Sequence, residues 1–301
     1  MFCLLVIVFS FSVTKLQAAR LHAFLIADTI SGEDGIVKNL DSMQRQVKRI
    51  AAFTDLKLNA FLFEGEQVRI ANVIQQLDNL KIKPNDVVLL YFSMHGSRTL
   101  QKKNCWPDLI FTIDRSFDGE MGYLDMNKLN ERVLNKHPRL LLAIADSCNT
   151  YRIIDNKFLS EDFLISGNIN EKNQAFLLPT PAFHQIKLGK NERAELKMTQ
   201  DNSCLKLYRT LFLKNKGSII TSAAKPGYIA IQEPATGGVY TMQFIKALQD
   251  LTGFSNRHTH NLGKESLSWK IVLDLASMQT QDQLIQNDYK GADVPQFEIS
   301  Y

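Results

Sequence analysis

The 301-residue chain is 45% hydrophobic and 22% charged, which is typical of a globular protein. It is long enough for one sizeable core or two small domains. Its formal net charge of +4 is small and spread along the sequence, so the composition gives no support for nucleic-acid binding, which needs a clustered basic patch. The sequence contains no internal repeat, low-complexity tract or glycine-rich phosphate loop.

The N-terminus has most features of a secretory signal peptide. The largely apolar run Phe2–Val13 has the length of a signal-peptide core and is too short for a membrane span of about 20 residues. Ala18 and Ala19 follow it, although no Lys or Arg precedes the run and Leu16 occupies a position where a small residue is usual. We expect residues 1–18 to be removed on export, which predicts a secreted or periplasmic protein. A buried first strand or a misassigned start codon is the alternative.

The first third of the mature chain alternates short apolar runs with stretches of helical spacing. Strands are predicted at Leu21–Ala27, Leu56–Phe63 and Asp86–Ser93, and helices at Asn39–Phe53 and Gln67–Leu80. A β-α-β-α-β order predicts a parallel sheet with helices on both faces and right-handed crossovers.

The rest of the chain continues the pattern after one stretch, Tyr151–Asn215, that has no clear periodicity. The predicted elements are strands at Pro107–Asp114, Arg139–Asp146, Gly217–Ala224 and Val294–Ile299, and helices at Leu124–Leu134, Tyr240–Leu251 and Ser266–Met278. The last strand is expected at an edge of the sheet.

Two of these strands stop abruptly on reactive residues. One leads into His95 and Gly96, and the other leads through Asp146 into Cys148. In open α/β sheets, ligands bind outside the carboxyl ends of the strands. An imidazole beside a thiol raises the thiolate fraction and can protonate a leaving amine. Either residue alone is usually structural, so the prediction of a nucleophilic site depends on their occurring together.

The same residues carry a resemblance to a known family. Tyr91–Gly96 resembles the Tyr-Phe-Ser-Gly-His-Gly motif of caspase-like cysteine peptidases, in particular metacaspases and bacterial caspase homologues of peptidase family C14. Asp146–Cys148 resembles their Asp-x-Cys, and the spacing from histidine to cysteine is typical of caspases. Gly217–Gly227 resembles the strand after the nucleophile, and Gly238–Thr241 resembles the family's Gly-Val-Phe-Thr. The similarity extends roughly from Leu21 to Leu248.

This resemblance implies a three-layer α/β/α sandwich around a mostly parallel, six-stranded sheet. Residues 19–301 would form one domain: a larger part at 21–150, a linker or insertion at 151–215, and a smaller part at 216–301. The implied activity is that of a cysteine endopeptidase without a cofactor.

The roles of individual residues follow from the same resemblance and from ordinary thiol chemistry. Cys148 would be the nucleophile and His95 the general acid and base. The backbone N–H groups of Gly96 and Cys148, just past the strand ends, are the expected oxyanion donors.

The expected substrate has an Arg or Lys side chain before the cleaved bond. Asp146 and Cys148 leave the same face of one strand, and Ser93 has the same relation to His95. In metacaspases the aspartate matching Asp146 lines the pocket for the basic side chain, and a buried carboxylate needs such a cation. The alternative is that Asp146 only holds the local turn or pairs with an internal lysine.

Two departures from the family pattern weaken the expected preference. Met94 replaces the usual glycine before the histidine, and its bulk could alter access to the site. The register of the first helix places Gln46 where many metacaspases have a second pocket aspartate. These features favour a second interpretation, a caspase-like binding or scaffold module with little or no catalysis. A third, another thiol enzyme such as an acyl transferase, gives no reason for Asp146.

No metal is predicted. His258 and His260 have a spacing that occurs in metal sites, but no carboxylate or thiol lies near them in the sequence. Asp114, Asp118 and Asp125 are scattered without the spacing of calcium ligands, so calcium activation is not expected.

The remaining cysteines and basic residues give two open alternatives. Loss of Cys3 with the leader leaves three cysteines, of which Cys105 and Cys204 could pair in an oxidising compartment. The polar run Lys187–Asn202 resembles an exposed linker. It is either cut by the protein itself at Lys190 or Arg193 or remains an uncut loop.

Overall fold

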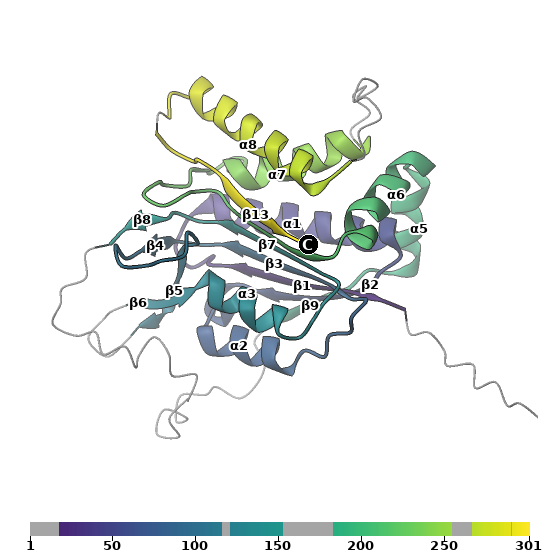
Figure 1. Ribbon diagram of the computed structural model, residues 1–301, viewed down its shortest axis with the longest axis horizontal. Coiled ribbons are helices and arrows are strands. Elements are labelled where there is room, and N and C mark those ends of the chain that lie inside the picture. Colours follow the sequence, from purple (N-terminus) through teal and green to yellow (C-terminus); the bar gives the residue numbers. More distant parts are fainter. Residues whose placement is uncertain (1–17, 116–120, 153–182, 255–266, 290) are drawn as a thin grey trace, which may run out of the picture.

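The computed structural model describes residues 18–115, 121–152, 183–254, 267–289 and 291–301. At its centre is a seven-stranded sheet, one strand more than the six expected, with the strand order β13-β10-β7-β3-β1-β2-β9 (Figure 1). The strands are β1 (Arg20–Ala27), β2 (Lys57–Phe63), β3 (Val87–Ser93), β7 (Leu140–Asp146), β9 (His184–Ile186), β10 (Gly217–Ser222) and β13 (Gln296–Ser300). The inner strands run parallel, and the edge strands β13 and β9 run antiparallel to their neighbours.

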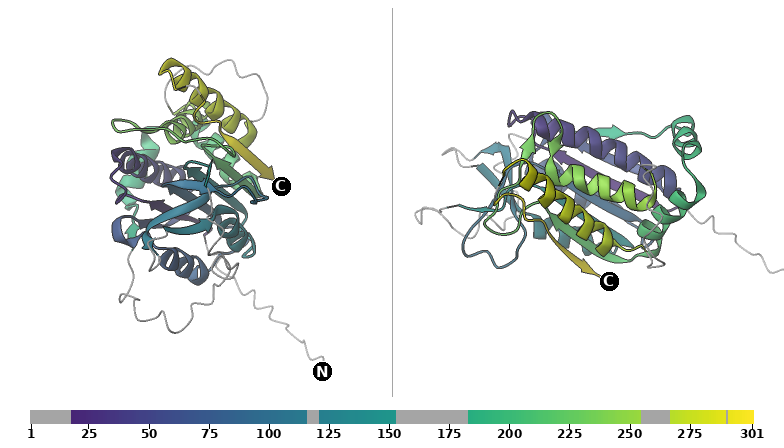
Figure 2. Two further views of the ribbon diagram at one scale, coloured as in Figure 1. Left: turned by 90° about the vertical axis from the view of Figure 1, so that its left-hand side faces the viewer. Right: turned by 90° about the horizontal axis from the view of Figure 1, so that it is seen from above.

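Helices cover both faces of the sheet, which confirms the predicted three-layer α/β/α arrangement (Figure 1). One face carries α1 (Asp34–Thr54), α5 (Lys190–Met198), α6 (Asn202–Arg209), α7 (Val239–Thr252) and α8 (Trp269–Gln286), and the other carries α2 (Ile70–Asn79) and α3 (Met126–Leu134). Single turns, η1 (Gly65–Gln67) and η3 (Thr210–Lys214), precede α2 and follow α6. Seen from above in Figure 2, α1, α7 and α8 lie side by side over their face of the sheet.

Two small sheets extend the molecule beyond the carboxyl ends of β3 and β7. Four strands form the first, in the order β6-β5-β4-β8, and two form the second. The strands are β4 (Gly96–Arg98), β5 (Asp108–Arg115), β6 (Met121–Asp125) and β8 (Thr150–Tyr151), and then β11 (Gln232–Glu233) and β12 (Gly237–Gly238). Only residues 94–95 separate β3 from β4, and only residues 147–149 separate β7 from β8. Each of these two short segments is therefore held by a strand on both sides.

The two central strands are buried along their whole length, which explains their unbroken apolar sequences. In β3, Leu89 and Tyr91 join the core under α1 and α7, whereas Leu90 and Phe92 join the core under α2 and α3. Successive side chains of a strand point to opposite faces, so a strand between two helix layers needs apolar residues at every position. This burial holds the polar residues at the strand ends in fixed places.

The segment without clear periodicity contains ordered structure that the sequence did not reveal. The expected exposed linker, Lys187–Asn202, instead contains α5 and the start of α6. The Arg193 guanidinium donates to the carbonyl oxygens of Ala51 and Leu56, at 2.6 and 2.9 Å, at the end of α1. No residue of α5 is buried, so the segment is exposed, but it is helical and not the flexible loop that was one of the two alternatives. Self-cleavage at Lys190 or Arg193 stays a prediction.

The possible pairing of Cys105 with Cys204, which the sequence left open, does not occur in the structure. Cys105 packs against the core under α2 and α3, and Cys204 belongs to the core under α1 and α7 on the opposite face of the sheet. Both are free thiols, as is Cys148. A disulfide requires Cα atoms about 4.4–6.8 Å apart, which cysteines on opposite faces of a sheet do not achieve.

Several other predictions fall on residues that the structure does not describe. They concern the signal peptide, of which residues 1–17 are outside the described ranges, and also Cys3, Asp118, His258 and His260. Among the described residues, no helix is long and apolar enough to cross a membrane. Nor does this part of the chain hold a group of three or more His, Cys, Asp or Glu side chains arranged for a metal ion.

Candidate active site

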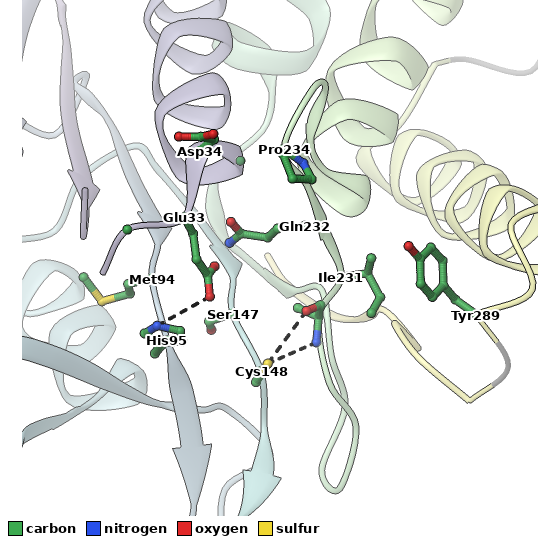
Figure 3. A pocket seen from close by; sticks show the side chains of 13 residues that line it. Glu33, Asp34, Met94, His95, Ser147, Cys148, Ile231, Gln232, Pro234 and Tyr289 are labelled. Atoms are coloured by element: carbon green, nitrogen blue, oxygen red, sulfur yellow. Dashed lines mark hydrogen bonds and ion pairs between the residues drawn. The ribbon is translucent and has the colours of Figure 1, made fainter. Parts of the chain in front are cut away.

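The strand register brings the two predicted catalytic residues to the same level. Ser93 at the end of β3 is paired with Asp146 at the end of β7. His95 and Cys148 each follow these partners by two residues, so the neighbouring parallel strands deliver them side by side. Both side chains line one cleft of about 470 Å³ (Figure 3).

Segments from five parts of the chain form this cleft. Besides the two strand ends, it is lined by the turn before α1, the segment between β10 and β12, and one side chain that follows α8 (Figure 3). The lining residues are Gly32, Glu33, Asp34, Gly35, Met94, His95, Ser147, Cys148, Ala230, Ile231, Gln232, Pro234 and Tyr289. Apart from the histidine, the charged side chains of this lining are both acidic.

The Cys148 thiol is held by the backbone of Ala230. The N–H of Ala230 donates to the sulfur at 3.3 Å, and the thiol lies 3.8 Å from the Ala230 carbonyl oxygen, to which it donates. Burial raises the pKa of Cys148, and the charges of Asp293, Asp146 and Glu33 raise it further, whereas the Ala230 N–H lowers it. In the absence of substrate these surroundings favour the protonated thiol over the thiolate.

The imidazole of His95 lies beside a carboxylate. Its Nε2 is 3.6 Å from Oε1 of Glu33, and both side chains are partly exposed, at 43% and 42% (Figure 3). Within the described residues, no hydrogen bond joins His95 to Cys148. The structure thus brings the predicted dyad into one cleft while each member contacts a different neighbour.

Gly96 permits the close approach of the two strand ends. A Cβ atom at this position would lie 2.3 Å from the backbone oxygen of Cys148 and 3.0 Å from the Ser147 side chain. The predicted oxyanion donors, Gly96 and Cys148, are consequently adjacent in space. Their role at an oxyanion remains a prediction.

Asp146 lies behind the cleft and does not line it. Its carboxylate is fully buried, and Oδ2 accepts hydrogen bonds from the Thr241 N–H at 3.1 Å, from the Thr241 hydroxyl and from the Asn39 amide at 3.3 Å. The Asn39 amide also donates to the hydroxyl of Ser93 at 2.9 Å. The other oxygen, Oδ1, has no hydrogen-bond partner among the described residues. Burial raises the pKa of Asp146 to about 6.

The hairpin of β11 and β12 closes over this carboxylate. A Cβ atom at Gly238 would lie 2.0 Å from Oδ2 of Asp146, and the Gly238 N–H donates to the Asn39 side chain at 2.6 Å. Gly238 is the N-cap of α7 and has no side chain to cap it, so Asp146 supplies a cap through its bond to the Thr241 N–H. The carboxylate therefore has a local structural role, which was the alternative to a substrate pocket.

The predicted register of the first helix was wrong. Gln46 lies in the core, where its amide donates to the Tyr208 hydroxyl at 3.0 Å. Asn39, about two helical turns earlier, occupies the position next to Asp146. Asn39, like Gln46, is uncharged, so no second carboxylate is in hydrogen-bond contact with Asp146.

Met94 borders the cleft but is only 2% exposed and packs into the core under α2 and α3, so its bulk points mainly away from the cleft.

The sequence did not predict the contacts that four other residues make around the site. These are Glu33, Asn39, Ala230 and Thr241, and each contacts one of the predicted residues. Glu33 follows β1, whose carboxyl end lies at the same edge of the sheet, so the strand-end rule could have identified it. Asn39 lies on the buried face of α1, Thr241 in the first turn of α7 and Ala230 in an irregular segment, and in none of these places does periodicity indicate a polar contact.

The comparison with protein families agrees with this arrangement. The family model described as the caspase domain, of peptidase family C14, matches residues 34–298, well over half of the chain. The chain belongs to the caspase family. The crystal structure of caspase-1 from Spodoptera frugiperda is similar with a TM-score of 0.44 and 10% identity, covering 93% of this chain and 86% of that one. Among curated proteins, none matches this chain.

Membership of the caspase family establishes a cysteine peptidase-like function at a coarse level. The matched region includes both strand ends, the hairpin over Asp146 and the segment that contacts Cys148. For a caspase-family domain, the expected substrates are proteins, and the details of cleavage depend on the residues described above.

Proposed function

We propose that this chain is a cysteine endopeptidase of the metacaspase-like branch, with Cys148 as nucleophile and His95 as general acid and base. The observation that carries the proposal is the register of β3 and β7, which places both side chains in one cleft of a caspase-family domain. A buried cysteine alone would be an ordinary core residue, whereas this one is partly accessible and lies in a cleft beside a histidine.

The proposed reaction has two stages. The Cys148 sulfur, after its proton passes to His95, attacks the peptide carbonyl and forms a carbon–sulfur bond. His95 then gives the proton to the departing amine, which leaves an acyl-enzyme. Water attacks the thioester as His95 accepts its proton. The carbon–sulfur bond then breaks, His95 returns the proton to the Cys148 sulfur, and the carboxylic acid product leaves. The N–H groups of Gly96 and Cys148 stabilise the oxyanion in both stages.

The same proposal includes cleavage after Arg or Lys. Asp146 supports it, because this buried carboxylate has one oxygen without a hydrogen bond and no cation among the described residues bonded to it. A guanidinium would give Oδ1 the donor that it lacks and would neutralise the buried charge. Ser93 and Asn39 would form the rest of the pocket. Since the β11–β12 hairpin covers Asp146, a basic side chain can enter only when this hairpin moves aside.

Peptide hydrolysis tests the proposal. The purified protein is assayed on fluorogenic peptides that end in Arg, Lys, Asp or Leu, with Cys148→Ala as control. We expect cleavage after Arg and Lys that disappears in Cys148→Ala. Asp146→Ala should lose the preference for basic residues while the thiol still reacts with an alkylating agent. Normal cleavage by Cys148→Ala would contradict the mechanism, and an unchanged preference in Asp146→Ala would contradict only the pocket.

A second candidate is a caspase-like binding module with little or no catalysis. The contact of the Cys148 thiol with Ala230, together with its raised pKa, favours it. This candidate predicts no cleavage of any peptide and no alkylation of Cys148 at neutral pH. Alkylation that depends on pH, with cleavage of at least one basic peptide, would exclude it.

We also propose export of the protein, from the predicted signal peptide at residues 1–18. A mature N-terminus at Ala19 in the secreted or periplasmic fraction, identified by mass spectrometry, would support this proposal. Recovery of the intact chain starting at Met1 from the cytoplasm alone would contradict it.

A further inference from the structure

Glu33 contacts His95 from a turn that the proposed mechanism does not use. The turn follows β1 and ends at the start of α1. The carboxylate oxygen Oε1 of Glu33 lies 3.6 Å from Nε2 of His95. In Figure 3 the Glu33 side chain reaches down from the start of α1 towards the imidazole. Both residues line the cleft that contains Cys148.

The backbone around Glu33 is fixed from both sides. Asp28, at the start of the turn, donates its N–H to the Ser93 carbonyl oxygen at 3.0 Å and so ties the turn to β3. Gly32 has a φ of +82°, a conformation that favours glycine. A Cβ atom at Gly35 would lie 3.0 Å from the Gln232 side chain, so α1 starts in close contact with the hairpin. A side chain on such a support keeps its direction.

Glu33 occupies a helix N-cap without capping the helix. Side chains at this position usually accept a hydrogen bond from the first turn, but Glu33 makes no such bond and instead contacts His95. A residue that gives up a stabilising capping bond and contacts a side chain in a cleft instead is a candidate for a functional role.

We propose that Glu33 is a positioning residue that fixes the orientation and tautomer of His95, an inference that depends on the proposed peptidase function. A neutral imidazole has one N–H, and the partner of one nitrogen decides which atom carries it. With Nε2–H directed at the Glu33 carboxylate, Nδ1 has the lone pair that accepts the Cys148 proton. The same nitrogen then returns that proton to the departing amine, while the other proton stays on Nε2 and remains directed at Glu33.

The direct electrostatic effect of Glu33 on the Cys148 thiol opposes catalysis, whereas its positioning of His95 would promote it. Its negative charge raises the pKa of Cys148 and so disfavours the thiolate. Removal of this charge should therefore make Cys148 easier to deprotonate and at the same time make the enzyme slower. These opposing changes distinguish a positioning role through His95 from a general electrostatic or structural one.

Kinetics of Glu33→Gln provide the first test, with Asp41→Asn as a control that removes an equal charge from an exposed site on α1. Glu33→Gln should lower kcat by about tenfold or more, a part of the roughly 10²–10⁴-fold that general acid–base catalysis supplies, with little change in KM. Its Cys148 alkylation midpoint should move to lower pH. Glu33→Asp keeps the carboxylate and should recover part of kcat, and Asp41→Asn should match the wild type. An unchanged or higher kcat in Glu33→Gln would overturn the proposal.

A spectroscopic test does not need peptidase activity. Ring ¹⁵N NMR of the Cys148→Ala protein, at a pH where the imidazole is neutral, reports which nitrogen of His95 carries the proton. We expect the Nε2–H tautomer to predominate, and Glu33→Ala, added to the same background, to lower its population. The same tautomer populations in both proteins would overturn the proposal even if no peptide is ever cleaved. A tautomer change in a protein that cleaves nothing would instead refute the proposed function alone.

Discussion

At the scale of single residues, Asp146 lowers the stability of the fold when it is charged, and it also has a proposed function. Its carboxylate is fully buried without a bonded cation, and burial raises its pKa to about 6. A carboxyl group whose pKa is higher in the folded than in the unfolded protein binds its proton more tightly when folded. The fold therefore loses stability as the pH rises from about 4 to about 6, and the loss is complete above that range. Such costs are common where function requires a group that stability does not favour.

Asp146→Asn should remove this penalty, because asparagine has the same shape and can still accept the Thr241 hydrogen bonds. We expect the variant to be more stable than the wild type at pH 8 by about 1–3 kcal/mol, and equally stable near pH 4. Thermal unfolding at several pH values measures the difference. The variant should also lose its preference for basic peptides. Equal stability of the two proteins at pH 8 would show that the carboxylate is not destabilising.

The sequence predicted His95 and Cys148 because each ends a buried apolar strand, and such strands are recognisable without a structure. It misplaced the neighbour of Asp146 because Asn39 and Gln46 are seven residues apart. Residues with this spacing lie on the same face of a helix, so periodicity cannot tell which turn faces the site. Glu33 was missed for a different reason: an acidic residue in a polar loop is normally a solvated one.

At the scale of elements, the turn from β3 into β4 determines whether the two strand ends can meet. Gly96→Ala should push this turn away from β7, because its Cβ would lie 2.3 Å from the Cys148 backbone oxygen. We expect loss of peptidase activity and destabilisation by about 1–3 kcal/mol, as in other overpacked sites. Gly189→Ala is a matched control, since a Cβ there meets nothing within 4 Å. Equal activities of the two variants would refute the close approach.

The second element-scale prediction concerns α5, which the sequence did not reveal. This short helix has no fully buried residue, and of its side chains only Leu196 packs against the hydrophobic core, so it shows no long apolar stripe in the sequence. Arg193→Ala removes two hydrogen bonds to the end of α1 and should destabilise the fold by about 1–3 kcal/mol. Trypsin should then cut the variant faster between residues 187 and 202. Lys190→Ala is the control, and spontaneous cleavage of the wild type after Arg193 would contradict the ordered helix.

At the scale of the whole molecule, the C-terminal segment reaches back to the cleft. The Asp293 carboxylate accepts the Ile231 N–H at 2.7 Å, and the Asp293 N–H donates to the Ile229 carbonyl oxygen at 2.9 Å. These bonds flank Ala230, which in turn contacts the Cys148 sulfur. Residues from the far end of the chain thus support the wall of a site that begins with β1 and α1. No periodic pattern in the sequence could predict this support, because it depends on individual hydrogen bonds between irregular segments.

Asp293 should couple the stability of the molecule to the chemistry of its thiol. Burial and the charge of Asp146 raise the pKa of Asp293 to about 8, and one of its oxygens has no hydrogen-bond partner among the described residues. By the same linkage, the fold loses stability as the pH rises from about 4 to about 8. Asp293→Asn should therefore unfold at a higher temperature than the wild type at pH 8 to 9 but not near pH 4. Because the Asp293 charge raises the pKa of Cys148, the variant should also be alkylated at lower pH.

The double variant Asp146→Asn/Asp293→Asn tests whether the two carboxylates act on each other through the fold. If the Asp146 charge helps to keep Asp293 protonated, removal of either charge relieves part of the penalty on the other. The gain in unfolding temperature at pH 8 should then be smaller in the double variant than the sum of the two single gains. Strictly additive gains would mean that the two groups are independent. In that case the C-terminal segment would support the cleft only through its hydrogen bonds and not through its charge.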